Sequence, residues 1–123
     1  MLNYTNVITE EKSYSGLQMK EIKPVMKLVI RGKKREFLSA IGKSLNLLLP
    51  TEANTSSRSD KLTALWLSPD EWMVYSNETI NSESNEYETE NLLNKNISKT
   101  NLGAVTDVTD QFVLINIKGD KIF

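Results

Sequence analysis

The amino-acid sequence predicts an α+β fold: a ferredoxin-like βαββαβ unit with an antiparallel sheet and both helices on one face. Three observations support this prediction. Aromatic and branched residues in 62–76 surround a Ser-Pro-Asp turn, which indicates a β-hairpin. Residues 34–47 carry apolar side chains at helical spacing directly after a strand-like segment. A weaker helical pattern at 84–95 is followed by another strand-like segment at 104–109.

The composition is that of an ordinary globular chain, and it excludes several kinds of chemistry. Of the 123 residues, 39% are hydrophobic and 25% are charged, which suits one domain or part of one. The formal net charge of −1 gives no support for nucleic acid or an anionic membrane as a partner. The sequence contains no cysteine and no histidine, so disulfides, thiolate or histidine metal ligands and Ser-His or Cys-His pairs are excluded.

The chain is expected to consist of an amino-terminal arm, residues 1–24, and a single α+β domain, residues 25–123. The arm has no clear hydrophobic period, and it either frays or packs against a partner. Residues 1–4 lack the pattern of a secretion signal, and no apolar segment reaches the length of a membrane span. We therefore expect a cytoplasmic protein without a membrane partner.

The first half of the domain reads as a strand followed by a helix. Residues 25–31 place apolar side chains on one face of a strand, which ends at Gly32. The helix is expected over 34–47, and Pro50 stops it. Residues 51–60 are almost entirely polar and are expected to form a loop.

The hairpin at 62–76 is the most apolar and most sharply bounded segment of the chain. Pro69 sets the backbone for the first corner of its turn, and the Asp70 side chain can cap that turn. Trp66 and Trp72 lie on the two flanking strands, where they would anchor a small core. They could instead stack on a flat ligand such as a pterin or flavin, although large aromatic residues in small domains are more often core anchors.

The last third of the chain supplies a helix and two strands. The helix is expected over 84–95, where Tyr87 and two leucines form its apolar face. Branched residues indicate a strand at 104–109, and residues 110–111 make a short corner. Residues 112–117 are the most strand-like run of the chain.

Two short segments near the two ends of the domain are similar in sequence. Residues 28–32, Leu-Val-Ile-Arg-Gly, are similar to residues 115–119, Ile-Asn-Ile-Lys-Gly. The second of these segments follows a completed βαββαβ unit. This placement predicts a duplicated fold, whose second repeat starts at 115–119 and is interrupted at Phe123.

The residue types present do not make up an active site. Asp70 and Glu71 are neighbours at a turn, which points their carboxylates in different directions rather than into one acid–base pair. Asp107 lies on a strand, where a carboxylate either faces water or has a specific partner. The glycines are isolated, so the sequence contains no phosphate-binding loop. We expect no catalytic, cofactor-binding or metal-binding residue in this chain.

Three segments in this order resemble the gamma subunit of heterotetrameric sarcosine oxidase. Residues 49–55, Leu-Pro-Thr-Glu-Ala-Asn-Thr, are similar to Leu-Pro-x-x-Pro-Asn-Thr of that family, with Ala53 in place of its second proline. Residues 64–72 contain Trp-Leu-Ser-Pro-Asp-Glu-Trp, which matches its Trp-Leu-Gly-Pro-Asp-Glu-Trp except at Ser68. Residues 104–110, Ala-Val-Thr-Asp-Val-Thr-Asp, are close to its Ala-Val-Thr-Asp-Val-Ser-Asp. Members of the family continue beyond this point, in agreement with the interrupted repeat.

The resemblance implies a fold like the folate-binding domain of aminomethyltransferases and a place in sarcosine catabolism and one-carbon metabolism. The enzyme demethylates sarcosine oxidatively to glycine, and it yields hydrogen peroxide and, with tetrahydrofolate, methylenetetrahydrofolate. The resemblance implies that FAD, FMN, NAD and tetrahydrofolate are bound by the larger alpha and beta subunits, which are the expected partners. The gamma subunit is implied to be an accessory subunit without catalytic residues.

The resemblance also marks residues that serve the core of the subunit or its contact with a partner. They are Trp66, Pro69, Asp70, Trp72 and Asp107. An alternative function is a small folate-binding or one-carbon transfer domain, in which a tryptophan stacks on the pterin and Asp107 accepts its ring N–H groups. A third possibility is a degenerate gene fragment without present function.

Overall fold

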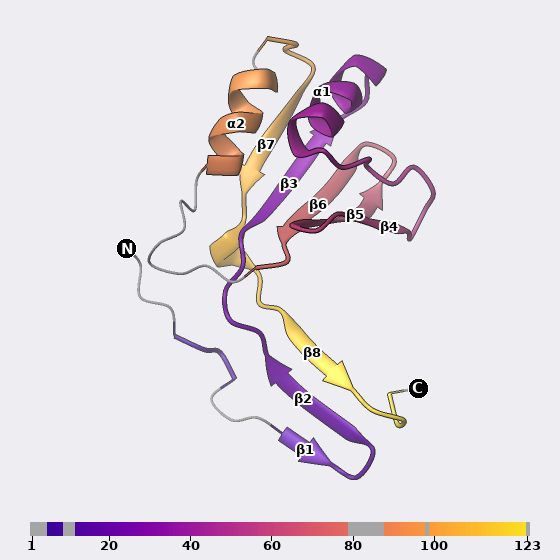
Figure 1. The fold of residues 1–123 in the computed structure, drawn as a ribbon, viewed down its shortest axis with the longest axis vertical. Coiled ribbons are helices and arrows are strands. Elements are labelled where there is room, and N and C mark those ends of the chain that lie inside the picture. Colours follow the sequence, from indigo (N-terminus) through magenta and orange to yellow (C-terminus); the bar gives the residue numbers. More distant parts are fainter. Residues whose placement is uncertain (1–4, 9–11, 79–87, 98, 123) are drawn as a thin grey trace.

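The computed structural model describes residues 5–8, 12–78, 88–97 and 99–122, and these form two antiparallel sheets and two α-helices (Figure 1). The elements in chain order are β1 Lys12–Tyr14, β2 Leu17–Glu21, β3 Lys27–Gly32, α1 Arg35–Leu45, β4 Ser56–Arg58, β5 Leu62–Ser68, β6 Glu71–Ser76, α2 Glu88–Ile97, β7 Gly103–Asp107, a short 3₁₀ helix Thr109–Gln111 and β8 Ile115–Lys118.

The larger sheet, here called the main sheet, confirms the predicted ferredoxin-like unit. The elements β3, α1, β5, β6, α2 and β7 follow the predicted order, and the strands are arranged β4-β5-β6-β3-β7. All of its pairings are antiparallel, so β3 and β5 run parallel to each other on either side of β6. Both helices cover the same face of the sheet (Figure 1).

The core lies between the helices and the main sheet. Strand alternation turns Leu28 and Ile30 of β3 toward the helices, and both are fully buried. Phe37 and Ile41 lie four residues apart on α1, so they share the face that packs on the sheet. Leu93 of α2, Ala64 of β5 and Val74 of β6 are also fully buried in this core.

The Phe37 ring packs over a pair of glycines. Gly32 and Gly103 are opposite each other on β3 and β7. A Cβ atom built on either glycine would lie less than 3.0 Å from ring atoms of Phe37. These two glycines therefore permit close approach of α1 to the sheet, rather than an unusual backbone conformation.

The first helix ends two residues earlier than residues 34–47 predicted. Asn46 adopts a left-handed conformation with φ of 50°, and the backbone N–H groups of Asn46 and Leu47 both donate to the Gly42 carbonyl. Asparagine tolerates this conformation better than most residues, so it can close a helix. The turn directs Leu47 into the core, where it is buried.

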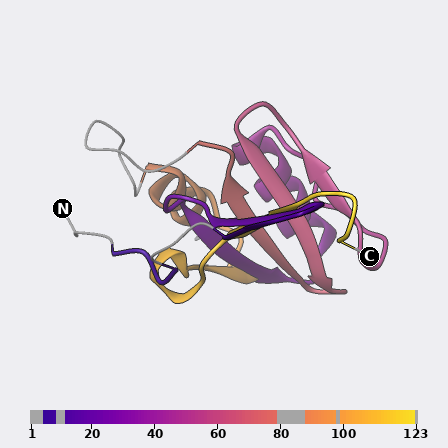
Figure 2. The same ribbon diagram turned by 90° about the horizontal axis from the view of Figure 1, so that it is seen from below.

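The smaller sheet has the order β1-β2-β8 and projects from the end of the main sheet away from the helices (Figure 1). Two connections join the sheets, residues 22–26 from β2 to β3 and residues 108–114 from β7 to β8. Seen from below, β2 and β8 lie side by side across the main sheet (Figure 2). Residues 12–21, which belong to the expected arm 1–24, thus contain two paired strands.

The prediction of a loop over 51–60 is wrong for three residues, because the edge strand β4 lies within this range. Its polar residues pair with Thr63, Ala64 and Leu65 of β5, and an edge strand that faces water does not need apolar residues. The strand expected at 112–117 begins only at Ile115. The beginning of the helix expected at 84–95, including Tyr87, lies outside the described residues.

Candidate functional site

The five predicted candidates lie at two separate places on the main sheet. Trp66, Pro69, Asp70 and Trp72 belong to the β5–β6 hairpin, and Asp107 ends β7. Trp72 and Asp107 are on strands that flank β3 from opposite sides. The structure therefore gathers the first four candidates in one hairpin and leaves Asp107 apart from them.

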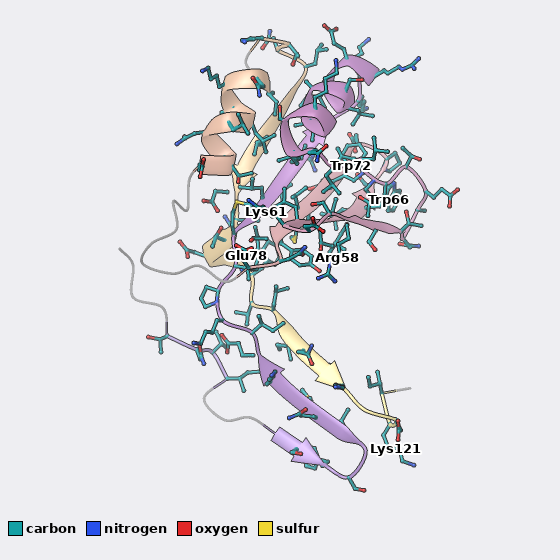
Figure 3. The ribbon with its side chains drawn as sticks, in the orientation of Figure 1. Arg58, Lys61, Trp66, Trp72, Glu78 and Lys121 are labelled. Atoms are coloured by element: carbon teal, nitrogen blue, oxygen red, sulfur yellow. The ribbon has the colours of Figure 1, made fainter. Side chains whose placement is uncertain are left out.

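The two tryptophans form a cross-strand pair at the end of the hairpin (Figure 3). Trp72 is 2% exposed, and its indole Nε1 donates a hydrogen bond of 2.7 Å to the Pro50 carbonyl. Trp66 opposite it is half-buried. Trp72 is thus a core anchor with its polar atom satisfied, and it presents no ring face on which a pterin or flavin could stack.

The Ser68–Asp70 turn uses its polar groups internally. The Ser68 hydroxyl donates to Asp70 Oδ1 at 2.8 Å, and this hydrogen bond holds the pKa of the Asp70 carboxyl below its usual value. The Asp70 carbonyl accepts the Gly32 N–H at 2.9 Å. Glu71 is paired with Arg31 at 3.0 Å across the β3–β6 pair, on the surface. The two neighbouring carboxylates therefore have separate structural partners and do not form an acid–base pair.

Asp107 also contacts the backbone rather than an open surface. Its Oδ1 accepts the Thr109 N–H at 2.8 Å, which fixes the turn into the short 3₁₀ helix. The Thr109 Oγ1 in turn accepts the Lys27 backbone N–H at 3.0 Å. Asp107 thereby stabilises the junction between the main sheet and the connection that leads to β8.

Lys27 at this junction is a residue that the sequence did not single out. Its side chain is on the face away from the helices, yet the residue is only 2% exposed. The ammonium Nζ donates to the carbonyls of Val25 and Thr109, each at 3.1 Å. Burial lowers the pKa of Lys27, and the charges of Asp110 and Asp107 act in the opposite direction. The sequence contained no signal for this burial, because Lys27 occupies an ordinary polar position of an alternating strand.

A small pocket lies beside Lys27, between the two sheets. Its volume is about 140 Å³, and Glu21, Lys23, Lys27, Asp110 and Phe112 contribute to its lining. Pockets that hold a drug-sized ligand commonly measure about 300–1,000 Å³. The Glu21 carboxylate already accepts the Ile8 N–H at 2.6 Å. We assign no ligand to this pocket.

The two faces of the small sheet differ: one is mainly apolar, with the charged residue Glu21 opposite Ile115 at its end, and the other is polar. The apolar face is formed by Tyr14, Leu17, Met19, Ile115 and Ile117. Its centre is open: Ile115 is 45% and Ile117 48% exposed. No described element covers this face, so it is the candidate interface. The polar face is formed by Ser13, Gln18, Lys20, Asn116 and Lys118.

Within the described part of the chain, no cluster of three or more metal-ligating side chains is present. No described helix has the length and apolar character needed to cross a membrane. Every buried side-chain nitrogen or oxygen in the described residues has a hydrogen-bond partner. The described polar core is therefore internally satisfied and offers no orphaned group to a ligand.

Comparisons with known proteins identify a similar fold. No protein-family model matches the chain, and no curated protein matches it either. A solved chain of a heterotetrameric sarcosine oxidase from Corynebacterium sp. U-96, in complex with pyrrole 2-carboxylate, matches with a TM-score of 0.70 and 17% sequence identity. The match covers 84% of this chain and 50% of the solved one, so the present chain spans about half the length of that neighbour. At this identity the likeness establishes the fold alone.

Proposed function

We propose that this chain is a non-catalytic accessory subunit of a sarcosine oxidase complex, in the position of its gamma subunit. The observation that carries the proposal is the fold likeness to a chain of a heterotetrameric sarcosine oxidase, at a TM-score of 0.70. The sequence segments at 49–55, 64–72 and 104–110 point to the same family.

The described geometry supports an accessory role rather than a catalytic one. Trp72 is buried in the core, and the side chains of Asp70 and Asp107 accept hydrogen bonds from neighbouring residues. The open apolar face of the small sheet, with Ile115 and Ile117 at its centre, supports a role in assembly.

In this proposal the chemistry belongs to the larger alpha and beta subunits. These subunits would bind FAD, FMN, NAD and tetrahydrofolate and convert sarcosine to glycine. The products would be hydrogen peroxide and methylenetetrahydrofolate. The present chain would bind none of these cofactors and would contribute contact surface.

The direct test is affinity purification of the tagged full chain from its native cells. The expected result is co-purification of large yellow flavoproteins, with sarcosine-dependent peroxide formation in the eluate. Purification of the chain alone, colourless and without peroxide formation, would overturn the proposal.

The alternative function, a folate-binding or one-carbon transfer domain, is not favoured by the described geometry. It requires a tryptophan and a free Asp107 carboxylate beside one ligand. Trp72 is buried, and the half-buried Trp66 lies on β5, with β6 and β3 between it and β7. Asp107 on β7 already accepts the Thr109 N–H. Titration with tetrahydrofolate separates the two functions: the accessory role predicts no ligand-specific quenching of tryptophan fluorescence at micromolar concentration, and saturable quenching would favour the alternative.

A further inference from the structure

The outer edge of β8 carries backbone groups that no described strand pairs. The Ile22 N–H donates to the Leu114 carbonyl at 2.8 Å, so Leu114 faces β2. Because successive residues of an antiparallel strand alternate in direction, Asn116 also faces β2, and the N–H and C=O groups of Ile115 and Ile117 point to the other edge. In the described chain β8 is the last strand of its sheet on that side. This edge is available for one more strand.

Strand β3 shows what covers a segment of this sequence elsewhere in the same molecule. Residues 28–32 and 115–119 share the order apolar, variable, apolar, basic, glycine. In β3 both edges are paired, with β6 and β7, and Leu28 and Ile30 are fully buried beneath a helix. In β8 only one edge is paired, and Ile115 and Ile117 are about half exposed. Relative to β3, β8 lacks a strand on one side and an apolar cover.

The charge of the polar face disfavours a second copy of the chain paired about Ile117. Lys20 and Lys118 lie on this face and are exposed, and in the β2–β8 register they are opposite Asn116 and Gln18. An antiparallel pair of two β8 strands centred on Ile117 would bring the two copies of Lys118 into diagonal positions on one face. Side chains in such positions are within interaction distance, so these like charges would repel. A strand with acidic residues at these positions would be attracted instead.

We propose that the outer edge of β8 binds an extended strand of a partner polypeptide. The strand has apolar side chains on the face shared with Ile115 and Ile117, and acidic side chains on the face shared with Lys20 and Lys118. This recognition combines backbone hydrogen bonds with alternating side-chain contacts. The inference deepens the proposed function and rests on it for the existence of a partner subunit.

The first test uses a peptide probe and the full chain. The probe is a capped ten-residue peptide of alternating valine and glutamate, and the control peptide has lysine in place of glutamate. Amide hydrogen exchange of Ile115 and Ile117 is followed by NMR with peptide at millimolar concentration. We expect at least tenfold slower exchange of both amides with the glutamate peptide, and less than a twofold change with the lysine peptide.

Two variants test the geometry and the charge separately. In Ile117→Pro the lost N–H points away from β2, so the β2–β8 hydrogen bonds remain while pairing at the outer edge is blocked. We expect the protection of Ile115 by the glutamate peptide to disappear. The matched proline control is Leu67→Pro, at a 42% exposed position left out of the β5–β6 register at a bulge, and it keeps the protection. In Lys118→Glu, which leaves the edge intact, we expect the preference between the two peptides to reverse.

Three results would overturn the inference. These are no protection with either peptide, equal protection with both, and protection that rises with protein concentration in the absence of peptide, which would identify a second copy as the occupant. The peptide test does not use sarcosine oxidase. Protection by the peptide without co-purified flavoproteins would support the strand-binding edge and contradict the proposed function. Co-purified flavoproteins without protection by the peptide would support the proposed function and contradict the strand-binding edge.

Discussion

The backbone N–H of Lys27 donates to the Thr109 Oγ1 at 3.0 Å, and its side-chain Nζ donates to the Thr109 carbonyl at 3.1 Å, across 82 positions of sequence. The Lys27 carbonyl also accepts the Val108 N–H at 2.9 Å. One residue thus fastens the start of β3 to the chain that leaves β7. Because the ammonium is buried, its charge is stabilised by carbonyl oxygens rather than by water.

Replacement of Lys27 with methionine is expected to change how stability depends on alkaline pH. Burial lowers the pKa of Lys27 from its ordinary value of 10.5, so the unfolded chain binds more protons than the folded one between the two pKa values. The free energy of unfolding should therefore rise with pH in that window for the natural chain, and this contribution should be absent from Lys27→Met. Urea unfolding between pH 7 and 10.5 measures it, with Lys118→Met as the control for loss of an exposed lysine. The same pH dependence in natural chain and Lys27→Met would contradict the prediction.

The Trp72–Pro50 contact should make the hairpin sensitive to a conservative change. Trp72→Phe removes the indole donor and leaves the Pro50 carbonyl unpaired in a buried place, so we expect a loss of about 1–3 kcal/mol of stability. Trp66→Phe, on the half-buried partner, should cost less than about 1 kcal/mol, because the Trp72–Pro50 hydrogen bond is kept and more of the Trp66 ring is exposed. Chemical denaturation of both variants measures the difference, and equal losses would show that the hydrogen bond is not the cause.

The pKa of Asp70 should depend on the Ser68 hydroxyl. In Ser68→Ala the donor is gone, so the pKa of Asp70 is expected to move back up toward its usual value. The sign for stability follows: a carboxylate with a lowered pKa stabilises the fold above its unfolded pKa, and this stabilisation is lost as the pH falls through the folded pKa. Carboxyl chemical shifts followed by NMR from pH 2 to 7 test this. Ser76→Ala is the control, since its hydroxyl accepts the Glu78 N–H and lies away from Asp70.

The glycines beneath Phe37 differ in what they contact, and this makes a double-mutant test possible. The three nearest atoms to a Cβ at Gly32 all belong to the Phe37 ring, whereas at Gly103 the Arg31 backbone carbonyl is also within 3.0 Å. We expect Gly32→Ala to cost about 1–3 kcal/mol in stability, as overpacking does. Phe37→Leu should relieve most of this cost at Gly32 and much less of it at Gly103. Additive free energies at Gly32, measured by urea unfolding, would mean that the ring is not the obstacle.

Much of the fold could be predicted from local patterns. The hairpin at 62–76 combines branched and aromatic residues with a Pro-Asp turn, and helix α1 has a clear apolar period, so both were found close to their observed bounds. The edge strand β4 was missed because its residues Ser56–Arg58 carry no apolar signal, and its pairing depends on β5. The strand-like residues 112–117 indicated β8 as a strand, but nothing local could show that it pairs with β2 in a separate sheet.

The sequence could predict which candidate residues matter to the fold, but it could not predict which groups they contact. Trp72 was expected to anchor the core, and the structure places it there, 2% exposed. The hydrogen bonds of Asp107 and Lys27 depend on chain segments that approach only after folding, so no sequence period indicates them. The apolar face of the small sheet was missed for the same reason, since it combines residues from three strands.

Two chain crossings, rather than one, join the small sheet to the main sheet, and Lys27 ties them where they leave it. A single linker would let the small sheet rotate relative to the main sheet, whereas two anchored connections restrict its orientation. A displacement of β8 caused by a strand bound at its outer edge would therefore be transmitted to both β3 and β7. We therefore expect a strand bound at that edge to slow amide hydrogen exchange at Leu28, in the core beneath the helices, and at Val108, in the connection that leaves β7.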